Sequence, residues 1–123
     1  MRTLNYIILA VTDPATSAAF YTALLGVEPV ENSPGFVLYV LPNGIKLGLW
    51  IASEINPAPL PAGGVEITFS EASETDVRAT HAQWQGKATI LQPPTSMDFG
   101  FTFVAADPDG HRLRVFSPPP KPR

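Results

Sequence analysis

One internal repeat constrains the fold of this chain more than any other feature of its sequence. Residues 4–26 align without a gap on residues 64–86, and both segments end on a glycine. Further on, the tripeptide at 42–44 (PNG) corresponds to 108–110 (PDG), with a larger shift between the copies. The second copy therefore carries extra residues, which we place in a loop at about 92–98. Such a repeat indicates two similar structural units.

Each copy has the pattern of a strand, a helix and three further strands. Branched aliphatic residues at 6–11 and apolar alternation at 65–69 predict the first strand of each copy. Asp13 and Ser73 are suitable N-caps for the helices that follow. The remaining strands are expected at 28–31, 35–41 and 45–51, and at 87–91, 100–106 and 111–116. The last two strands of each copy are expected to join through type I′ turns at Asn43-Gly44 and Asp109-Gly110.

These elements predict the α+β class, with two βαβββ repeats. The chain has 123 residues, which is enough for a single domain with its own core. A βαβββ unit alone leaves one face of its sheet uncovered, so two units must pair or enclose a cavity, within one chain or across two. Within a single domain at 1–123 we expect repeat 1 at about 4–52, a Pro-rich linker at 53–63, repeat 2 at about 64–117 and a polyproline-like tail at 118–123.

Composition argues against several classes of partner. The net charge is −3 and Lys and Arg do not cluster, so we expect no nucleic acid partner. No apolar stretch approaches the roughly 20 residues that cross a bilayer, so we expect no membrane partner. The chain has no cysteine, and its start lacks a signal-peptide core, which predicts a cytoplasmic protein. His81 is expected to face solvent, and two separated histidines do not make a zinc site.

The segment at 106–115 (ADPDGHRLRV) resembles the signature of the vicinal oxygen chelate superfamily, which includes glyoxalases, bleomycin resistance proteins and extradiol dioxygenases. The helix end at 20–26 (FYTALLG) adds to this resemblance, which covers residues 4–117. The resemblance implies a curved mixed sheet built from the two repeats and paired across a homodimer. It also implies a divalent metal, held by one residue from the first and last strand of each repeat.

The family's metal-ligand positions fall in this chain on Tyr6, Gly48, Glu66 and Arg114. Only Glu66 could bind a metal ion, and a guanidinium pointing at the same centre would repel a cation. We therefore expect no metal and no other cofactor. What replaces the metal site is expected to be a cavity with aromatic walls and a few charges, which suits a small planar aromatic ligand.

Segments 49–51 and 98–103 resemble, within this superfamily, the type that confers resistance to phenazine antibiotics. The leading hypothesis is thus metal-independent binding and sequestration of a planar aromatic antibiotic of phenazine type. The expected ligand-binding residues are Trp50, Tyr6, Arg114, Glu66, Gly48, Phe36, Phe99 and His111. His111 also suits a turn-stabilising role, and Arg114 could instead pair with Glu66 and neutralise it.

Two other functions remain open. The first is a lyase, isomerase or dioxygenase of the same fold with an altered site, in which Glu66 acts as a base and Tyr6 or Arg114 as its electrostatic partner. The second is a regulatory or structural dimer, which predicts that Trp50 is packed rather than accessible. Trp84 shares a helix face with Val77, so we expect it in the core.

Overall fold

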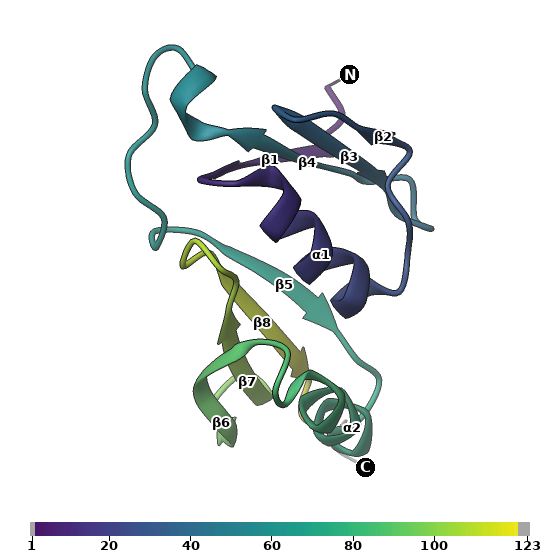
Figure 1. Cartoon of the computed structure of the whole chain (residues 1–123). Coiled ribbons are helices and arrows are strands. Elements are labelled where there is room, and N and C mark those ends of the chain that lie inside the picture. The colour runs from purple at the N-terminus through teal and green to yellow at the C-terminus, as the bar shows by residue number, and fades with distance from the viewer. Residues whose placement is uncertain (1, 121–123) are drawn as a thin grey trace. The chain divides into compact units, whose positions relative to one another are not determined.

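Two compact units make up the structure, a computed structural model that describes residues 2–120 (Figure 1). Unit 1 is Met1–Pro61 and unit 2 is Ala62–Arg123, so the boundary lies inside the predicted linker. Each unit consists of a four-stranded mixed sheet and one α-helix. The α+β class and the two βαβββ repeats are confirmed. That both units form one domain, and that the chain is a homodimer, stay predictions.

Unit 1 has its elements in the predicted order: β1 (Tyr6–Val11), α1 (Pro14–Leu25), β2 (Glu31–Asn32), β3 (Phe36–Val40), β4 (Lys46–Ile51) and the 3₁₀ helix Ala52–Glu54. The sheet order is β1-β4-β3-β2, with only β1 and β4 parallel. Asp13 caps α1, because its Oδ1 accepts from the backbone N of Ala15 at 3.1 Å. Gly26 ends α1 with a left-handed φ of 69°.

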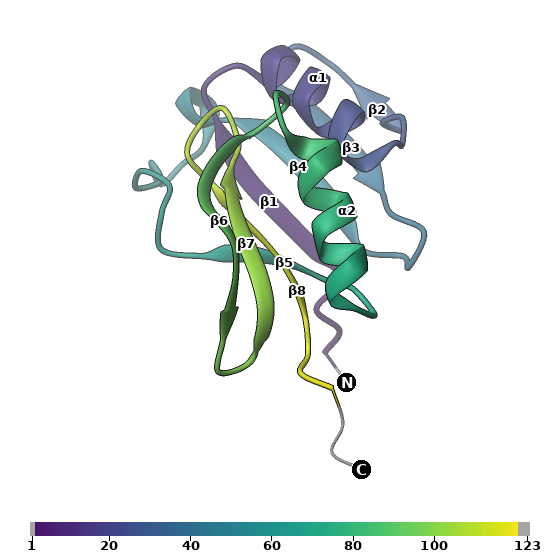
Figure 2. The ribbon, with the colours of Figure 1, turned by 90° about the horizontal axis from the view of Figure 1, so that it is seen from below.

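Unit 2 repeats this arrangement with β5 (Glu66–Ser70), α2 (Glu74–Trp84), β6 (Thr89–Met97), β7 (Gly100–Ala106) and β8 (Arg112–Ser117). The sheet order β5-β8-β7-β6 matches that of unit 1 strand for strand. Figure 2 shows β6 and β7 side by side in this sheet. Ser73 caps α2, accepting from the backbone N of Asp76 at 3.2 Å. Neither helix, nor any other within residues 2–120, has the length and apolar character needed to span a membrane.

The extra residues of the second repeat lie mostly in strand β6 and not in a loop. Strand β6 pairs with β7 through two register shifts, between Ile90 and Gln92 and between Gln92 and Thr95. Such bulges absorb additional residues without ending the pairing. Strand β6 is also an edge strand, where the missing N–H groups of Pro93 and Pro94 are tolerated. The prediction of a loop here was therefore wrong.

The two predicted type I′ turns are also wrong. A type I′ turn needs positive φ at both central residues, but every described residue with positive φ is a glycine, including Gly44 at 89° and Gly110 at 91°. The backbone N of Gly44 donates to the carbonyl of Leu41 at 2.8 Å. This is a three-residue loop, in which a type I turn precedes a left-handed glycine. Asn-Gly and Asp-Gly occur both in two-residue type I′ loops and in three-residue loops, so the length of the loop decides which of the two turns forms.

One face of each sheet packs against its helix and forms the core of the unit. In unit 1 the buried sheet residues are Leu9, Val11, Val37, Tyr39, Leu47 and Leu49. In unit 2, Val77 and Trp84 of α2 are buried as predicted, and Trp84 contacts Phe103 edge to face at 5.5 Å. The His81 ring lies 5.2 Å from that of Phe103 and is half-buried, so it faces solvent only in part.

Asp107→Ala should destabilise the β7–β8 turn. The buried Asp107 Oδ1 accepts from the backbone N of Asp109 at 2.8 Å and of His111 at 2.9 Å. Loss of this acceptor should lower the free energy of unfolding by about 1–3 kcal/mol, measured by urea denaturation. Asn43→Ala in the corresponding turn of unit 1 is the control, because its exposed Oδ1 accepts one bond, from Ile45 N. Equal losses in both variants would contradict this account.

Candidate functional site

Six of the eight predicted site residues lie on strands, on the sheet face that points away from the helix of their own unit. Side chains alternate along each strand, so every second residue lies on this open face. In unit 1 the register aligns Tyr6 with Lys46, and Phe36 with Trp50. The open face of unit 1 carries Tyr6, Ile8, Phe36, Lys46, Gly48 and Trp50. The open face of unit 2 carries Glu66, Thr68, Thr102, Arg112, Arg114 and Phe116.

Aromatic side chains gather around Gly48 on the open face of unit 1. A Cβ at Gly48 would lie 2.9 Å from Phe36 Cζ and 3.3 Å from Tyr6 Cε1. Because glycine has no side chain, the Phe36 and Tyr6 rings can both lie over the backbone of Gly48. The Trp50 ring centroid lies 6.5 Å from that of Phe36, with the rings nearly perpendicular. Lys46 Nζ lies 5.8 Å from the Tyr6 ring centroid. This face therefore offers an aromatic surface with one nearby cation.

The aromatic rings of this face are partly accessible. Tyr6 is 41% exposed, and Phe36 and Trp50 are half-buried. Trp84, in the core of unit 2, is only 5% exposed. Trp50 is therefore not packed away, contrary to what a purely structural role predicts.

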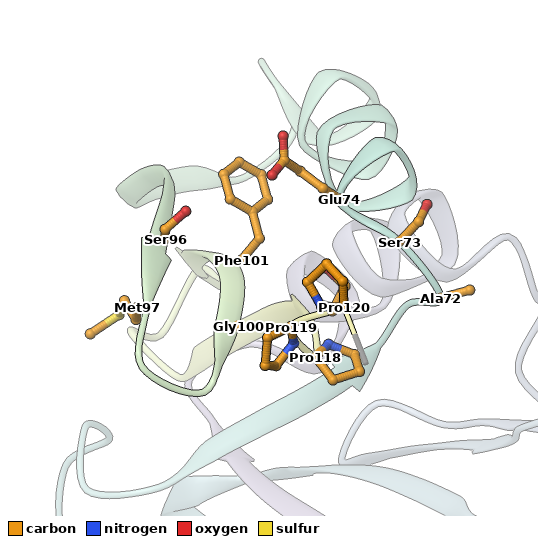
Figure 3. Close-up of a pocket in the computed structure, with 11 residues that line it drawn as sticks. Ala72, Ser73, Glu74, Ser96, Met97, Gly100, Phe101, Pro118, Pro119 and Pro120 are labelled. Carbon is orange, nitrogen blue, oxygen red and sulfur yellow. The ribbon is translucent and has the colours of Figure 1, made fainter. Parts of the chain in front are cut away.

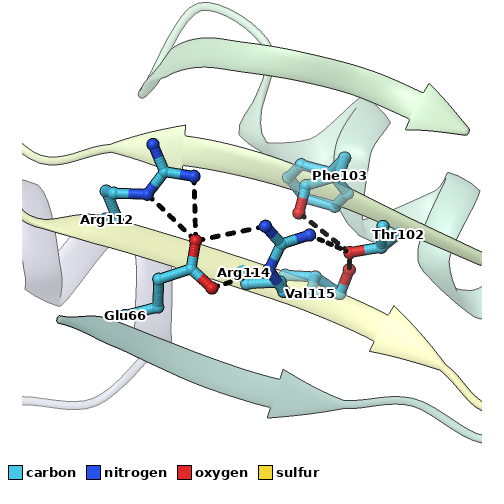
Figure 4. A network of polar contacts seen from close by, with 6 residues as sticks. All are labelled: Glu66, Thr102, Phe103, Arg112, Arg114 and Val115. Carbon is cyan, nitrogen blue, oxygen red and sulfur yellow. Dashed lines mark hydrogen bonds and ion pairs between the residues drawn. The ribbon is translucent and has the colours of Figure 1, made fainter. Parts of the chain in front are cut away.

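Glu66 is the centre of a polar network on the open face of unit 2 (Figure 4). Arg114 binds it through two nitrogens, with Nε to Oε1 at 2.8 Å and Nη2 to Oε2 at 3.1 Å. Arg112 binds Oε2 through Nε and Nη2, each at 2.9 Å. Arg114 Nη1 also donates to Thr102 Oγ1, which in turn donates to the carbonyl of Val115. The Glu66–Arg114 ion pair is thus confirmed, and Arg112 joins it.

The two guanidinium groups change the chemistry of Glu66. Hydrogen bonds from Arg114 lower the pKa of the Glu66 carboxyl below its ordinary value of 4.5. Partial burial raises this pKa, but a hydrogen bond from Arg112 lowers it further, so the net shift is downward. A general base works best with a pKa near the working pH. A lowered pKa therefore argues against Glu66 as the base of an enzyme.

The donor set does not fit the divalent metal that the resemblance implies. In unit 2 both Glu66 oxygens bind guanidinium nitrogens, whose charge repels a cation. In unit 1 the corresponding positions supply the phenol of Tyr6 and the bare backbone of Gly48. Within residues 2–120, no three His, Asp or Glu side chains come together as metal ligands.

Phe99 and His111 take different places in unit 2. The Phe99 ring, 43% exposed, lies 5.8 Å from that of Phe116 and 5.5 Å from the Arg114 guanidinium, so it borders the Glu66 network. His111 lies in the β7–β8 turn, where its backbone N donates to Asp107. The turn-stabilising role of His111 is confirmed for its backbone, and its ligand contact stays a prediction.

The sequence prediction of site residues left out Arg112. Strand alternation already placed Arg112 on the same face as Arg114, two residues away. Its contact with Glu66 depends on the register of the parallel pair β5–β8, in which Glu66 lies opposite Arg112. That register could not be read from the sequence.

A cavity of about 550 Å³ lies elsewhere in unit 2 (Figure 3). Its walls come from the start of α2, the β6–β7 hairpin and Pro118–Pro120, and they include Glu74 and Phe101. None of the predicted site residues lines it. The rest of the predicted tail, 121–123, lies outside the described residues.

Glu66→Gln should lower stability in a pH-dependent way. Because the folded state lowers the pKa of Glu66, its ion pairs stabilise the fold above about pH 4.5, and this stabilisation is lost as the pH falls through the lower, folded-state pKa. The wild type should therefore exceed the variant in free energy of unfolding at pH 7, by a margin that shrinks as the pH falls below 4.5. Urea denaturation across this range measures the margin.

Glu74→Gln is the matched control for this measurement. Glu74 pairs with Arg78 on the surface of α2, where both side chains are more than half exposed. Its loss should change stability little at any pH, because exposed ion pairs contribute little. A margin for Glu66→Gln that is constant with pH would contradict the assigned role of its charge.

The chain is similar to three known proteins along most of its length. The chain is 27% identical over 115 residues to the phenazine antibiotic resistance protein EhpR of Enterobacter agglomerans, covering 90% of this chain and 88% of that protein. A protein of Agrobacterium tumefaciens solved by NMR is 46% identical, with a TM-score of 0.89 and coverage of 98% of this chain and 100% of that chain. A glyoxalase-related enzyme from Fulvimarina pelagi is 23% identical, with a TM-score of 0.84 and coverage of 95% and 88%, and it shows the fold alone.

The model of one protein family matches residues 3–115, which include both repeats. Its description agrees with the resemblance drawn from the DPDGH turn and the repeated βαβββ pattern. The fold of both units is consistent with the match. The chain belongs to the Glyoxalase/Bleomycin resistance protein/Dioxygenase superfamily.

Proposed function

We propose that this protein binds and sequesters a small planar aromatic compound without a metal ion, and that the compound is an antibiotic of phenazine type. The observation that carries this proposal is the set of partly accessible rings of Tyr6, Phe36 and Trp50 around Gly48. In unit 1, an aromatic surface thus surrounds Tyr6 and Gly48, the positions that hold metal ligands in the family. A flat ligand can stack on such rings, because their faces are apolar and polarisable.

Unit 2 offers polar recognition of its own, through the Glu66 network. Ligand sites combine apolar walls with a few fixed polar groups that orient the ligand. The Arg112 and Arg114 guanidinium groups are held by Glu66 in fixed positions beside the Phe99 ring. A planar compound with a polar substituent matches these charged groups and the Phe99 ring beside them, all within unit 2.

Two observations favour binding over catalysis. Both Glu66 oxygens already accept hydrogen bonds from guanidinium groups, and the pKa of this carboxyl is lowered, so Glu66 is a poor proton acceptor at neutral pH. The relative from Enterobacter agglomerans is by name a phenazine antibiotic resistance protein, which supports the choice of ligand class. The homodimer stays a prediction, which sedimentation equilibrium tests.

The two tryptophans allow ligand binding at Trp50 to be observed directly. Trp84→Phe leaves Trp50 as the single indole, and phenazine should then quench the fluorescence in a saturable way. Trp50→Phe leaves only Trp84, which is buried against Phe69 and Phe103, and phenazine should quench it little. If phenazine quenched Trp84 in the Trp50→Phe variant but left Trp50 unquenched in the Trp84→Phe variant, the ligand would bind elsewhere, and the proposal would be contradicted.

Calorimetry is needed as well, because a Trp50 variant loses its own reporter. Trp50→Ala should weaken phenazine binding roughly fivefold or more, the equivalent of about 1 kcal/mol of aromatic contact. Unchanged affinity would sink the stacking role. Mass spectrometry of phenazine after incubation with the wild type separates the functions further, since a chemically altered compound would establish the enzyme alternative.

Gly48→Ala should weaken ligand binding by displacing the aromatic rings. The new Cβ would lie 2.9 Å from Phe36 Cζ, so the ring must move. Overpacking costs about 1–3 kcal/mol, which corresponds to roughly tenfold in affinity where the ring contacts the ligand. Gly64→Ala is the matched control, because a Cβ there meets nothing within 4 Å. Equal affinities of the two variants would show that the niche at Gly48 plays no part.

A further inference from the structure

On the basis of the function proposed above, we propose that the three side chains Arg112, Glu66 and Arg114 form, within unit 2, a receptor for the anionic group of a planar aromatic compound, so that the preferred ligand is a planar aromatic carboxylate. Arg112 is then the residue that determines specificity for the anion.

The first support is the charge of this receptor. Arg112 and Arg114 both bind the same carboxylate, that of Glu66 (Figure 4). Two guanidinium groups and one carboxylate leave one positive charge in excess. A charge on a partly buried sheet face is unfavourable without a counter-charge, which an anionic ligand would supply.

The second support is the geometry of Arg112. Its Nε and Nη2 both bind Glu66 Oε2, so the remaining nitrogen, Nη1, lies outside these contacts. The Arg112 side chain is 37% exposed, whereas that of Arg114 is 15% exposed. The planar guanidinium is therefore held in place on one side and reachable from the other, as anion recognition requires.

The third support is the aromatic pair beside the charge. The exposed Phe99 ring lies 5.8 Å from the Phe116 ring and 5.5 Å from the Arg114 guanidinium carbon. Phe116 also lies on the same face of β8 as Arg112 and Arg114. An aromatic acid could thus contact these rings while its carboxylate reaches Arg112. A free inorganic anion would use only the charge.

The test compares phenazine-1-carboxylate with phenazine-1-carboxamide, which have nearly the same shape and differ in charge. Calorimetry with the full chain should give the wild type an affinity roughly tenfold higher for the carboxylate, since hydrogen bonds to charged groups contribute about 1.5–3 kcal/mol. Arg112→Gln should abolish this preference, because the affinity for the carboxylate should fall far more than the affinity for the carboxamide. Thermal unfolding of the variant checks that it is folded.

Arg78→Gln is the matched control, because Arg78 is an exposed guanidinium of the same unit that pairs with Glu74. It should keep the full preference for the carboxylate. Inorganic phosphate is the third arm, and it should compete only weakly.

Each other result overturns the inference in a distinguishable way. Equal wild-type affinities for the two phenazines, or a preference that survives in Arg112→Gln, would remove the anion receptor and leave the proposed function intact. Phosphate binding as tight as that of phenazine-1-carboxylate would mean a small-anion site without aromatic recognition. Binding of neither phenazine would remove the proposed function and this inference together.

Discussion

One helix covers one face of each four-stranded sheet, and this single covering determines where chemistry can occur in the protein. Strand alternation sends half of the side chains, such as Leu49 and Val115, into the core beneath the helix. The other half point away from the helix of their own unit. This face carries Tyr6, Phe36 and Trp50 in unit 1, and the charged Glu66, Arg112 and Arg114 in unit 2.

The two repeats use this freedom differently at corresponding positions. In unit 1 the parallel pair β1–β4 aligns Tyr6 with Lys46, a ring with a nearby cation. In unit 2 the parallel pair β5–β8 aligns Glu66 with Arg112, an ion pair. The corresponding positions Gly48 and Arg114 differ most. Gly48 leaves room for the neighbouring aromatic rings, whereas Arg114 occupies its position with a guanidinium group that binds Glu66. The same backbone thus carries an aromatic surface in one copy and a charged network in the other.

Local patterns in the sequence were sufficient to predict the repeats, the helix caps at Asp13 and Ser73, and the buried Trp84. Features that depend on pairing between strands were not predictable. The turn at Asn43-Gly44 depends on loop length, and the extra residues of β6 are absorbed by bulges that only the pairing with β7 reveals. The partnership of Arg112 with Glu66 likewise depends on a register between segments 46 residues apart.

The parallel pairing of first and last strands also affects how the chain can fold during synthesis. Strand β1 leaves the ribosome long before its partner β4, so the sheet of unit 1 cannot close until Ile51 has emerged. Unit 2 waits in the same way for β8, which lies near the C-terminus. A ribosome that stalls before Arg112 would therefore leave β5 as an unpaired strand, with the Glu66 carboxylate lacking both of its guanidinium partners. Such an exposed strand edge is a template for pairing with other chains, which favours aggregation.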